Sequence, residues 1–173
     1  GNDYLDGGGE AGDILNGGAG NDTYYIYNNA DIASIKETTG TDTLIFATTF
    51  DNDATAHNVV TYTLKATPFE NVDASYITDA TALEGNDLAN IIKGGSGVDN
   101  LTGGKGNDTY VINGVDDVIH EDADTKTVKG TGIDTIQISG DALDDVNLTT
   151  DTTHYANVEN IDASWTSDAK TLT

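Results

Sequence analysis

Two tandem nonapeptides at residues 94–111 constrain the fold of this chain more than any other feature. They read GGSGVDNLT and GGKGNDTYV, so each has the form G-G-x-G-x-D-x-(large apolar)-x. The glycines permit a tight turn that side chains would obstruct, and the residues after the aspartate form a short strand whose large residue points inward. Asp99 and Asp108 are nine residues apart, as are Leu101 and Tyr110. This repeat predicts an all-β fold, a right-handed parallel β-roll or β-solenoid.

Further copies of the nonapeptide lie on both sides of this stretch. They occupy residues 1–6, 8–16, 17–25 and 85–93, with Asp3, Asp13, Asp22 and Asn90 at the aspartate position. In the second of these copies Ala11 replaces the third glycine, and Asn90 lacks the charge of an aspartate. Counting nine residues onward also brings Asp31 and Asp117 into phase, although the glycines are gone there.

At these residues the chain resembles the RTX (repeats-in-toxin) family of secreted bacterial proteins. The resemblance implies that the turns bind Ca²⁺ and that the array folds when Ca²⁺ is present. It also implies export through a type I secretion system. The clear repeats cover only part of the chain, so the resemblance does not describe the segments between them.

Calcium takes about six to eight oxygen ligands, which carboxylates and backbone carbonyls can supply. The predicted carbonyl ligands lie in the turns, at Gly8, Gly17, Gly20, Gly94, Gly97, Gly103 and Gly106. Turns two repeats apart stack on the same side of a β-roll, about 4.8 Å apart. We therefore expect ions to be shared by four pairs, namely Asp99 with Asp117, Asn90 with Asp108, Asp13 with Asp31, and Asp3 with Asp22.

The chain also contains a long internal duplication. GNDTYYI (20–26) matches GNDTYVI (106–112), GTDTLIF (40–46) matches GIDTIQI (132–138), and residues 69–83 match residues 158–172. We divide the chain into two tiles, residues 1–84 and 85–173, within one continuous solenoid. The strongest strand predictions are residues 24–27, 43–47, 59–64, 109–112 and 135–138, and helix signals are poor throughout.

Two acidic pairs recur at equivalent places in the tiles. Glu37 with Asp42, and Glu121 with Asp134, are candidates for a further ion site, with a solvated loop as the alternative. Glu70, Asp73, Glu159 and Asp162 also recur, and we expect these four side chains to point outward from a strand, with a metal-binding role as the alternative.

The charge balance limits the possible partners. The 30 acidic residues and 7 lysines give a net charge of -23, which excludes nucleic acids and anionic membranes because both require clustered positive charge. Such a charge opposes compaction, so we expect a cation to belong to the folded state. The chain has no cysteine and no apolar run near the length of about 20 residues that spans a membrane. Together with the resemblance, this predicts a secreted or cell-surface protein, of which the chain is a fragment.

Catalysis finds little support in the sequence. His57, His120 and His154 are scattered, and no metalloprotease or serine-hydrolase motif is present. We expect a non-catalytic module of a large extracellular protein such as an adhesin. The alternative is an accessory module of a toxin or a secreted enzyme, such as a protease, a lipase or a polysaccharide-modifying enzyme. Tyr76 and Trp165 occupy equivalent places and are interpreted as packing residues, with contact to a sugar or protein partner as the alternative.

Overall fold

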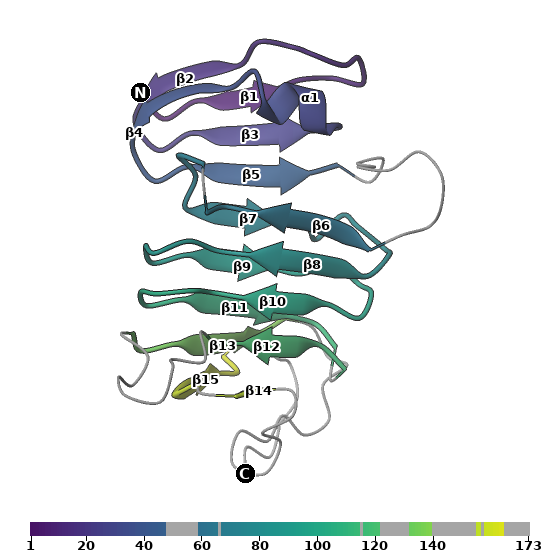
Figure 1. Ribbon diagram of the computed structural model, residues 1–173, viewed down its shortest axis with the longest axis vertical. Helices are drawn as coiled ribbons and strands as arrows, with labels where there is room; N and C mark the ends of the chain where they lie inside the picture. The colour runs from purple at the N-terminus through teal and green to yellow at the C-terminus, as the bar shows by residue number, and fades with distance from the viewer. Residues whose placement is uncertain are drawn as a thin grey trace.

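The structure is a computed structural model that describes residues 1–47, 59–65, 67–114, 116–121, 132–139, 155–156 and 158–164. The segments 48–67 and 139–153, which lack the nonapeptide repeat, fall largely outside these residues. Trp165, His57 and His154 lie outside them as well. The described residues form a stack of short parallel strands along one axis (Figure 1).

One wall of the stack is an eight-stranded parallel sheet, called here the long wall. Its strands in spatial order are β1 (Tyr4–Asp6), β3 (Thr23–Ile26), β5 (Thr43–Phe46), β7 (Asn71–Asp73), β9 (Ile91–Lys93), β11 (Thr109–Ile112), β13 (Thr135–Ile138) and β15 (Asn160–Asp162). Only odd-numbered strands occur in the long wall, so the chain leaves it after each strand and returns one rung further on.

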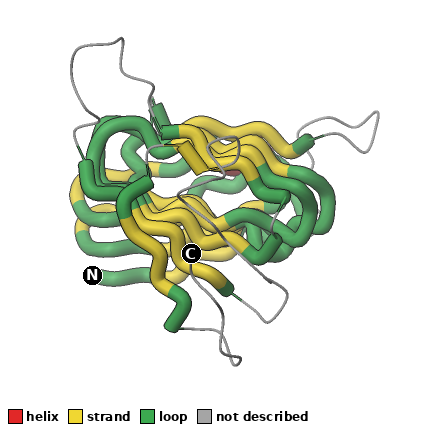
Figure 2. The backbone as a smooth tube through the Cα atoms, turned by 90° about the horizontal axis from the view of Figure 1, so that it is seen from below, coloured by secondary structure: helices red, strands yellow, loops and turns green. Residues whose placement is uncertain are grey.

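The opposite wall, called here the short wall, is a five-stranded parallel sheet. It contains β6 (Val60–Thr63), β8 (Thr81–Glu84), β10 (Asn100–Thr102), β12 (Val118–His120) and β14 (Tyr155–Ala156). Viewed along the axis, the strands of successive coils superpose in two walls joined by loops (Figure 2). The prediction of a parallel β-solenoid is therefore confirmed.

The N-terminal coils depart from this plan. There β2 (Asn16–Ala19) pairs with β4 (Lys36–Thr39), and a one-turn helix, α1 (Asn29–Ile32), lies between them in sequence. The Asn28 side chain caps α1 by accepting hydrogen bonds from the N–H groups of Ala30 and Asp31. The helix signals of the sequence are poor, and α1 is the only helix among the described residues. Within the described part of the chain, no helix has the length and apolar character needed to cross a membrane.

The core is a ladder of large apolar side chains between the two walls. In the long wall, one inward position is filled in successive rungs by Leu5, Tyr24, Leu44, Val72, Ile92, Tyr110, Ile136 and Ile161. Leu101 and Ile119 occupy the facing position in the short wall. Leu101 and Tyr110 are fully buried, which confirms that the apolar residue of the nonapeptide points inward. The predicted strands agree with the observed ones to within one residue at each end.

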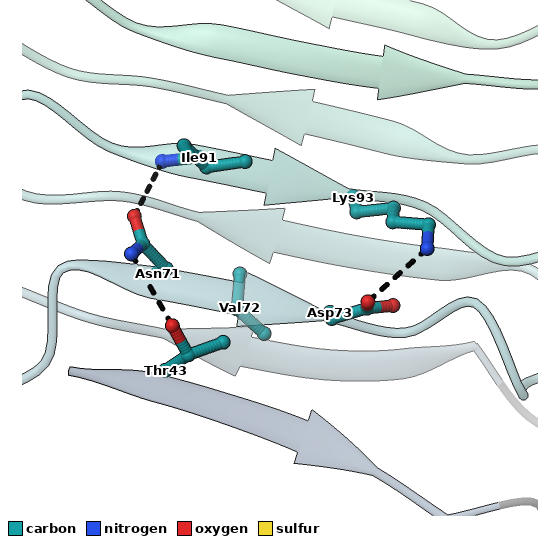
Figure 3. Close-up of a pocket in the computed structure, with 6 residues that line it drawn as sticks. All are labelled: Thr43, Asn71, Val72, Asp73, Ile91 and Lys93. Atoms are coloured by element: carbon teal, nitrogen blue, oxygen red, sulfur yellow. Dashed lines mark hydrogen bonds and ion pairs between the residues drawn. The ribbon is translucent and has the colours of Figure 1, made fainter. Parts of the chain in front are cut away.

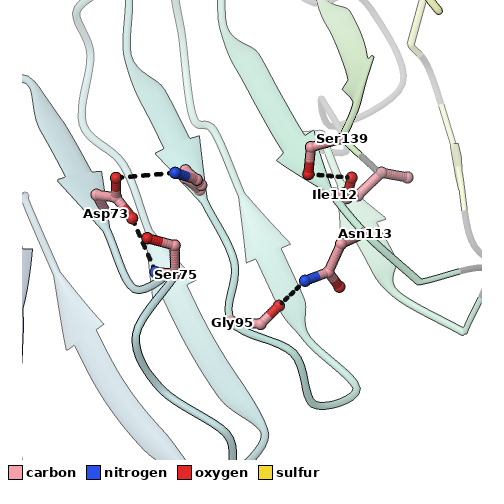
Figure 4. A network of polar contacts seen from close by, with 7 residues as sticks. Asp73, Ser75, Gly95, Ile112, Asn113 and Ser139 are labelled. Atoms are coloured by element: carbon pink, nitrogen blue, oxygen red, sulfur yellow. Dashed lines mark hydrogen bonds and ion pairs between the residues drawn. The ribbon is translucent and has the colours of Figure 1, made fainter. Parts of the chain in front are cut away.

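Side chains at the exit from the long wall hold neighbouring coils together. The Asn113 amide donates to the carbonyl of Gly95 at 2.6 Å, and the Ser139 hydroxyl donates to the carbonyl of Ile112 at 3.1 Å (Figure 4). The Gly95 carbonyl lies in a turn, and the Ile112 carbonyl at the end of β11 also accepts from the backbone N–H of Ser139 at 2.8 Å. The coils are thus joined at their turns as well as through their sheets.

The glycines of the nonapeptide have two separate roles. Gly104 and Gly106 have φ angles of 100° and 117°, which side chains rarely adopt. Gly94 has no positive φ, but a Cβ atom there would lie 2.2 Å from Oδ2 of Asp99. At Gly103 the same atom would lie 2.3 Å from Oδ2 of Asp108. The first glycine of both tandem repeats is therefore needed because its aspartate occupies the space of a side chain.

We predict that Gly94→Ala destabilises the fold because its new methyl group collides with the Asp99 carboxylate. Overpacking of this kind costs roughly 1–3 kcal/mol. Gly9→Ala is the matched control, since a Cβ atom at Gly9 meets nothing within 4 Å. Urea unfolding of both variants in calcium-containing buffer measures the difference. Equal free energies of unfolding would show that the Asp99 carboxylate does not need this space.

Candidate metal centre

Each strand of the long wall is preceded by a polar residue that contributes to a column running along the solenoid. This first column consists of Asp3, Asp22, Asp42, Glu70, Asn90, Asp108, Asp134 and Glu159. In the column, a backbone N–H donates to the side chain of the next rung. The N–H of Asp22 donates to Oδ1 of Asp42 at 2.8 Å, and the N–H of Asp108 donates to Oδ1 of Asp134, also at 2.8 Å.

The order of residue types along the first column follows the internal duplication of the sequence. Its first four members are Asp, Asp, Asp and Glu, and its last four are Asn, Asp, Asp and Glu. Glu70 and Glu159 end the two halves in the same way. Oε2 of Glu70 accepts from the N–H of Asp42 at 2.7 Å, and Oε2 of Glu159 accepts from the N–H of Asp134 at 3.0 Å. The expectation that these two glutamates point outward was wrong, because each caps a half of the column.

A second column precedes the strands of the short wall. The N–H of Asp99 donates to Oδ1 of Asp117 at 2.9 Å. Oδ1 of Asp99 in turn accepts from both the N–H and the hydroxyl of Thr81, each at 2.8 Å. Asp31, in α1, makes similar contacts near the N-terminus, with Oδ1 accepting from the N–H groups of Gly12 and Asp13 at 3.0 and 3.3 Å.

All four pairs expected from the nonapeptide spacing are in contact. In each pair the backbone N–H of the first residue donates to Oδ1 of the second, at distances from 2.7 to 3.3 Å, for Asp3 with Asp22, Asp13 with Asp31, Asn90 with Asp108, and Asp99 with Asp117. The stacking of turns two repeats apart is thus observed. That an ion lies between the members of a pair stays a prediction.

The predicted ligands differ in how free their oxygens are. Asp3 is exposed and Asp13 is only half-buried. Asn90 is buried, but its amide group donates to the carbonyl of Glu70 at 2.7 Å and its Oδ1 accepts from the N–H of Asn86 at 2.8 Å. These three residues are accordingly weaker candidates for ligands than the buried aspartates.

Four buried carboxylates each have one oxygen without a partner. Oδ2 has no hydrogen-bond partner in Asp22, Asp31, Asp99 and Asp108. Each of the four side chains is at most 1 % exposed. A buried, unpaired carboxylate oxygen is strongly unfavourable unless a cation or a proton compensates it.

Each tile contains a cluster of three carboxylates, and the two clusters lie at equivalent positions of the duplication. The first triad is Asp22, Glu37 and Asp42, and the second triad is Asp108, Glu121 and Asp134. Within each triad, one carboxylate oxygen per residue lies within 4.8 Å of the others. Two like charges at this separation repel by roughly 3 kcal/mol at an effective dielectric constant of about 20. Both triads therefore need positive charge.

A tyrosine orients the glutamate of each triad. The Tyr24 hydroxyl donates to Oε2 of Glu37, and the Tyr110 hydroxyl donates to Oε1 of Glu121. Tyr24 also accepts from the N–H of Gly17 at 3.1 Å. The nonapeptide pattern predicts only that both tyrosines belong to the core. Their spacing contains a usable signal, because a residue two positions after an inward aspartate in a strand points to the same side.

The second triad is the more enclosed of the two. Asp108, Glu121 and Asp134 are all buried, whereas Glu37 of the first triad is partly exposed. Burial raises the pKa of Asp108 to about 7. It also raises the pKa of Glu121 to about 8, with the charges of Asp134, Asp108 and Glu159 acting in the same direction. The charges that surround Glu121 are thus negative ones.

None of the ion pairs formed by lysines in the described part of the chain involves these clusters. Lys65, Lys93 and Lys105 form ion pairs with Glu84, Asp73 and Asp87, none of which belongs to a column. Asp73 therefore faces outward as predicted. The donors of the triads are all oxygens, which hard cations such as Ca²⁺ and Mg²⁺ prefer.

Comparison with protein-family models, with curated proteins and with solved structures gave no match to this chain.

We predict that the metal-free fold gains stability as the pH is lowered from 8 to 6. The folded-state pKa values of Asp108 and Glu121 are about 7 and about 8, whereas unfolded carboxyl groups titrate near pH 4. The folded state therefore binds more protons, and the free energy of unfolding rises as the pH falls through this range.

The folded fraction in excess chelator at pH 8, 7 and 6, taken from the far-UV circular dichroism spectrum, measures this dependence. The double variant Asp108→Asn, Glu121→Gln should show a weaker dependence on pH, because its amide side chains do not titrate. A folded fraction that instead rises with pH in the unsubstituted chain would contradict the account of the second triad.

Proposed function

We propose that this chain is a calcium-binding β-solenoid module of the RTX type that folds as it binds Ca²⁺. The observation that carries the proposal is the pair of equivalent carboxylate triads. Asp22 in the first triad and Asp108 in the second each hold a buried oxygen that no protein group satisfies. The same residue types recur at the same places of two coils, which favours a built site over a chance cluster.

The composition of the triads favours calcium over other metals. Three carboxylates supply hard, anionic oxygens, and the turn carbonyls expected from the sequence add neutral ones, which suits the six to eight ligands that Ca²⁺ takes. The chain contains no cysteine, and His120, the one histidine among the described residues, is exposed. Magnesium binds as well only where a compact octahedral set of ligands is available.

Each ion would join neighbouring coils. Asp22 precedes β3 and Asp42 precedes β5, which are adjacent strands of the long wall, and Glu37 lies in β4. In the second triad, Asp108 and Asp134 precede β11 and β13, while Glu121 follows β12 directly. An ion held by such a set neutralises the repulsion and links three segments, so its binding free energy becomes folding free energy.

The proposed setting is extracellular. At the low calcium concentration inside the cell, the carboxylates are not neutralised and the chain stays unfolded for secretion. The higher calcium concentration outside the cell then folds it. The long wall runs without interruption through both tiles, which favours a non-catalytic structural segment of a cell-surface or secreted protein. Its immediate partners are calcium ions and neighbouring repeats of the same polypeptide.

We predict that Glu121→Gln and Glu37→Gln each weaken calcium binding at one triad by about tenfold or more, since each removes a charged ligand from a buried site. Isothermal titration calorimetry of the calcium-free chain, with calcium as the titrant, measures the number and affinity of the sites. Glu10→Gln is the matched control, because Glu10 is exposed and belongs to neither column. Unchanged isotherms for both triad variants would overturn the assignment of the triads.

A further inference from the structure

Four tyrosines gather on the outer surface of the long wall near its N-terminal end. They are Tyr4 in β1, Tyr25 in β3, Tyr27 just after β3, and Tyr76 in the turn after β7. Tyr4 is 66 % exposed and Tyr76 is 50 % exposed. We call these four residues the tyrosine face. It is separate from the triads, whose tyrosines point inward.

The rings of the tyrosine face pack edge to face. The ring centroids of Tyr25 and Tyr27 are 5.3 Å apart, with an interplanar angle of 73°. Those of Tyr25 and Tyr76 are 5.7 Å apart, with an angle of 77°. β3 and β7 are separated by β5, so the face extends across several coils. In the turn that carries Tyr76, the N–H of Ser75 donates to Oδ1 of Asp73 at 2.8 Å, which fixes the start of the turn (Figure 4).

Polar groups border the rings. One outward-facing row of cross-strand partners in the long wall contains Asp6, Tyr25, Ile45 and Asp73. Next to them a shallow pocket is lined by Thr43, Asn71, Val72, Asp73, Ile91 and Lys93 (Figure 3). In it, Asn71 donates to the Thr43 hydroxyl at 3.3 Å, and Lys93 pairs with Asp73 at 3.2 Å. Aromatic surface thus adjoins hydroxyl, amide and carboxylate groups.

The internal duplication shows that the solenoid does not require Tyr25 and Tyr27. GNDTYYIYN in the first tile corresponds to GNDTYVING in the second. Tyr24 and its inward counterpart Tyr110 are the same residue type, whereas Val111 and Asn113 stand in place of Tyr25 and Tyr27. Folding therefore explains the inner tyrosines and leaves Tyr25 and Tyr27 without a structural reason, whereas Tyr76 has an aromatic counterpart in Trp165. Exposed aromatic clusters of this kind mark binding surfaces.

We propose that the tyrosine face binds a neutral polysaccharide. Tyrosine rings offer flat surfaces on which the apolar face of a sugar ring packs, and their hydroxyls remain available to water or to a ligand. The adjoining amide, hydroxyl and carboxylate groups suit the hydroxyls of a sugar. The exposed Asp6, within a chain of net charge -23, repels anionic polymers, so a neutral glycan is the complementary partner. This inference goes beyond calcium binding and does not depend on it.

Affinity electrophoresis tests this proposal directly. The folded chain is run through native gels that contain hydroxyethyl cellulose, laminarin or dextran, with alginate as the anionic comparison and calcium in every gel. We expect at least one neutral polysaccharide to retard the chain and alginate not to. Tyr25→Ala and Tyr76→Ala should weaken the retardation about tenfold or more, while Tyr25→Phe, which keeps the ring, should retain most of it.

Val111→Ala is the matched control, because Val111 is the equivalent of Tyr25 in the second tile, and it should leave the retardation unchanged. Circular dichroism confirms that each variant is folded. The proposal is overturned if none of the three neutral polysaccharides retards the chain, or if the tyrosine variants are retarded as strongly as the unsubstituted chain. It is also overturned if sedimentation shows a dimer that Tyr25→Ala dissociates, which would identify the face as a contact between copies.

Discussion

The hydrogen bond from a backbone N–H of one coil to a carboxylate of the next is the interaction on which this solenoid depends. It fixes the height of each rung and draws the aspartates out of water, since Asp22, Asp99 and Asp108 are each 1 % exposed. Only one oxygen of each is used in this way, and the other has no partner. The same geometry that orders the coils therefore creates a buried negative charge that the protein itself does not neutralise.

Much of this arrangement follows from the period of nine residues. The contacts of Asn90 with Asp108 and of Asp99 with Asp117 span 18 residues, or two repeats, and the sequence predicted both. Counting in steps of nine residues no longer predicts the contacts where a coil is longer than two repeats. The contact of Asp108 with Asp134 spans 26 residues, and that of Asp42 with Glu70 spans 28. The duplication identified Asp42, Asp134, Glu37 and Glu121 as recurring acids, but only the fold brings them against Asp22 and Asp108.

The glycines and the tyrosines show where residue type alone misleads. Gly94 resembles a turn residue chosen for its φ angle, yet its role is to leave room for the Asp99 carboxylate. Tyr24 and Tyr110 resemble core residues, and they are, but their hydroxyls also hold the glutamates of the triads. In both cases, the local pattern gives the position of a side chain, and the identity of its neighbour comes from the next coil.

If cations complete the buried columns, the stability of the fold must depend on them. The measurement that tests this most directly is the far-UV circular dichroism spectrum of the chain, in excess chelator and during titration with calcium, with magnesium as the comparison. The account predicts a largely unfolded chain in chelator that becomes β-structured cooperatively with calcium and not with magnesium. A spectrum that is already fully β-structured in chelator, and unchanged by calcium, would contradict it.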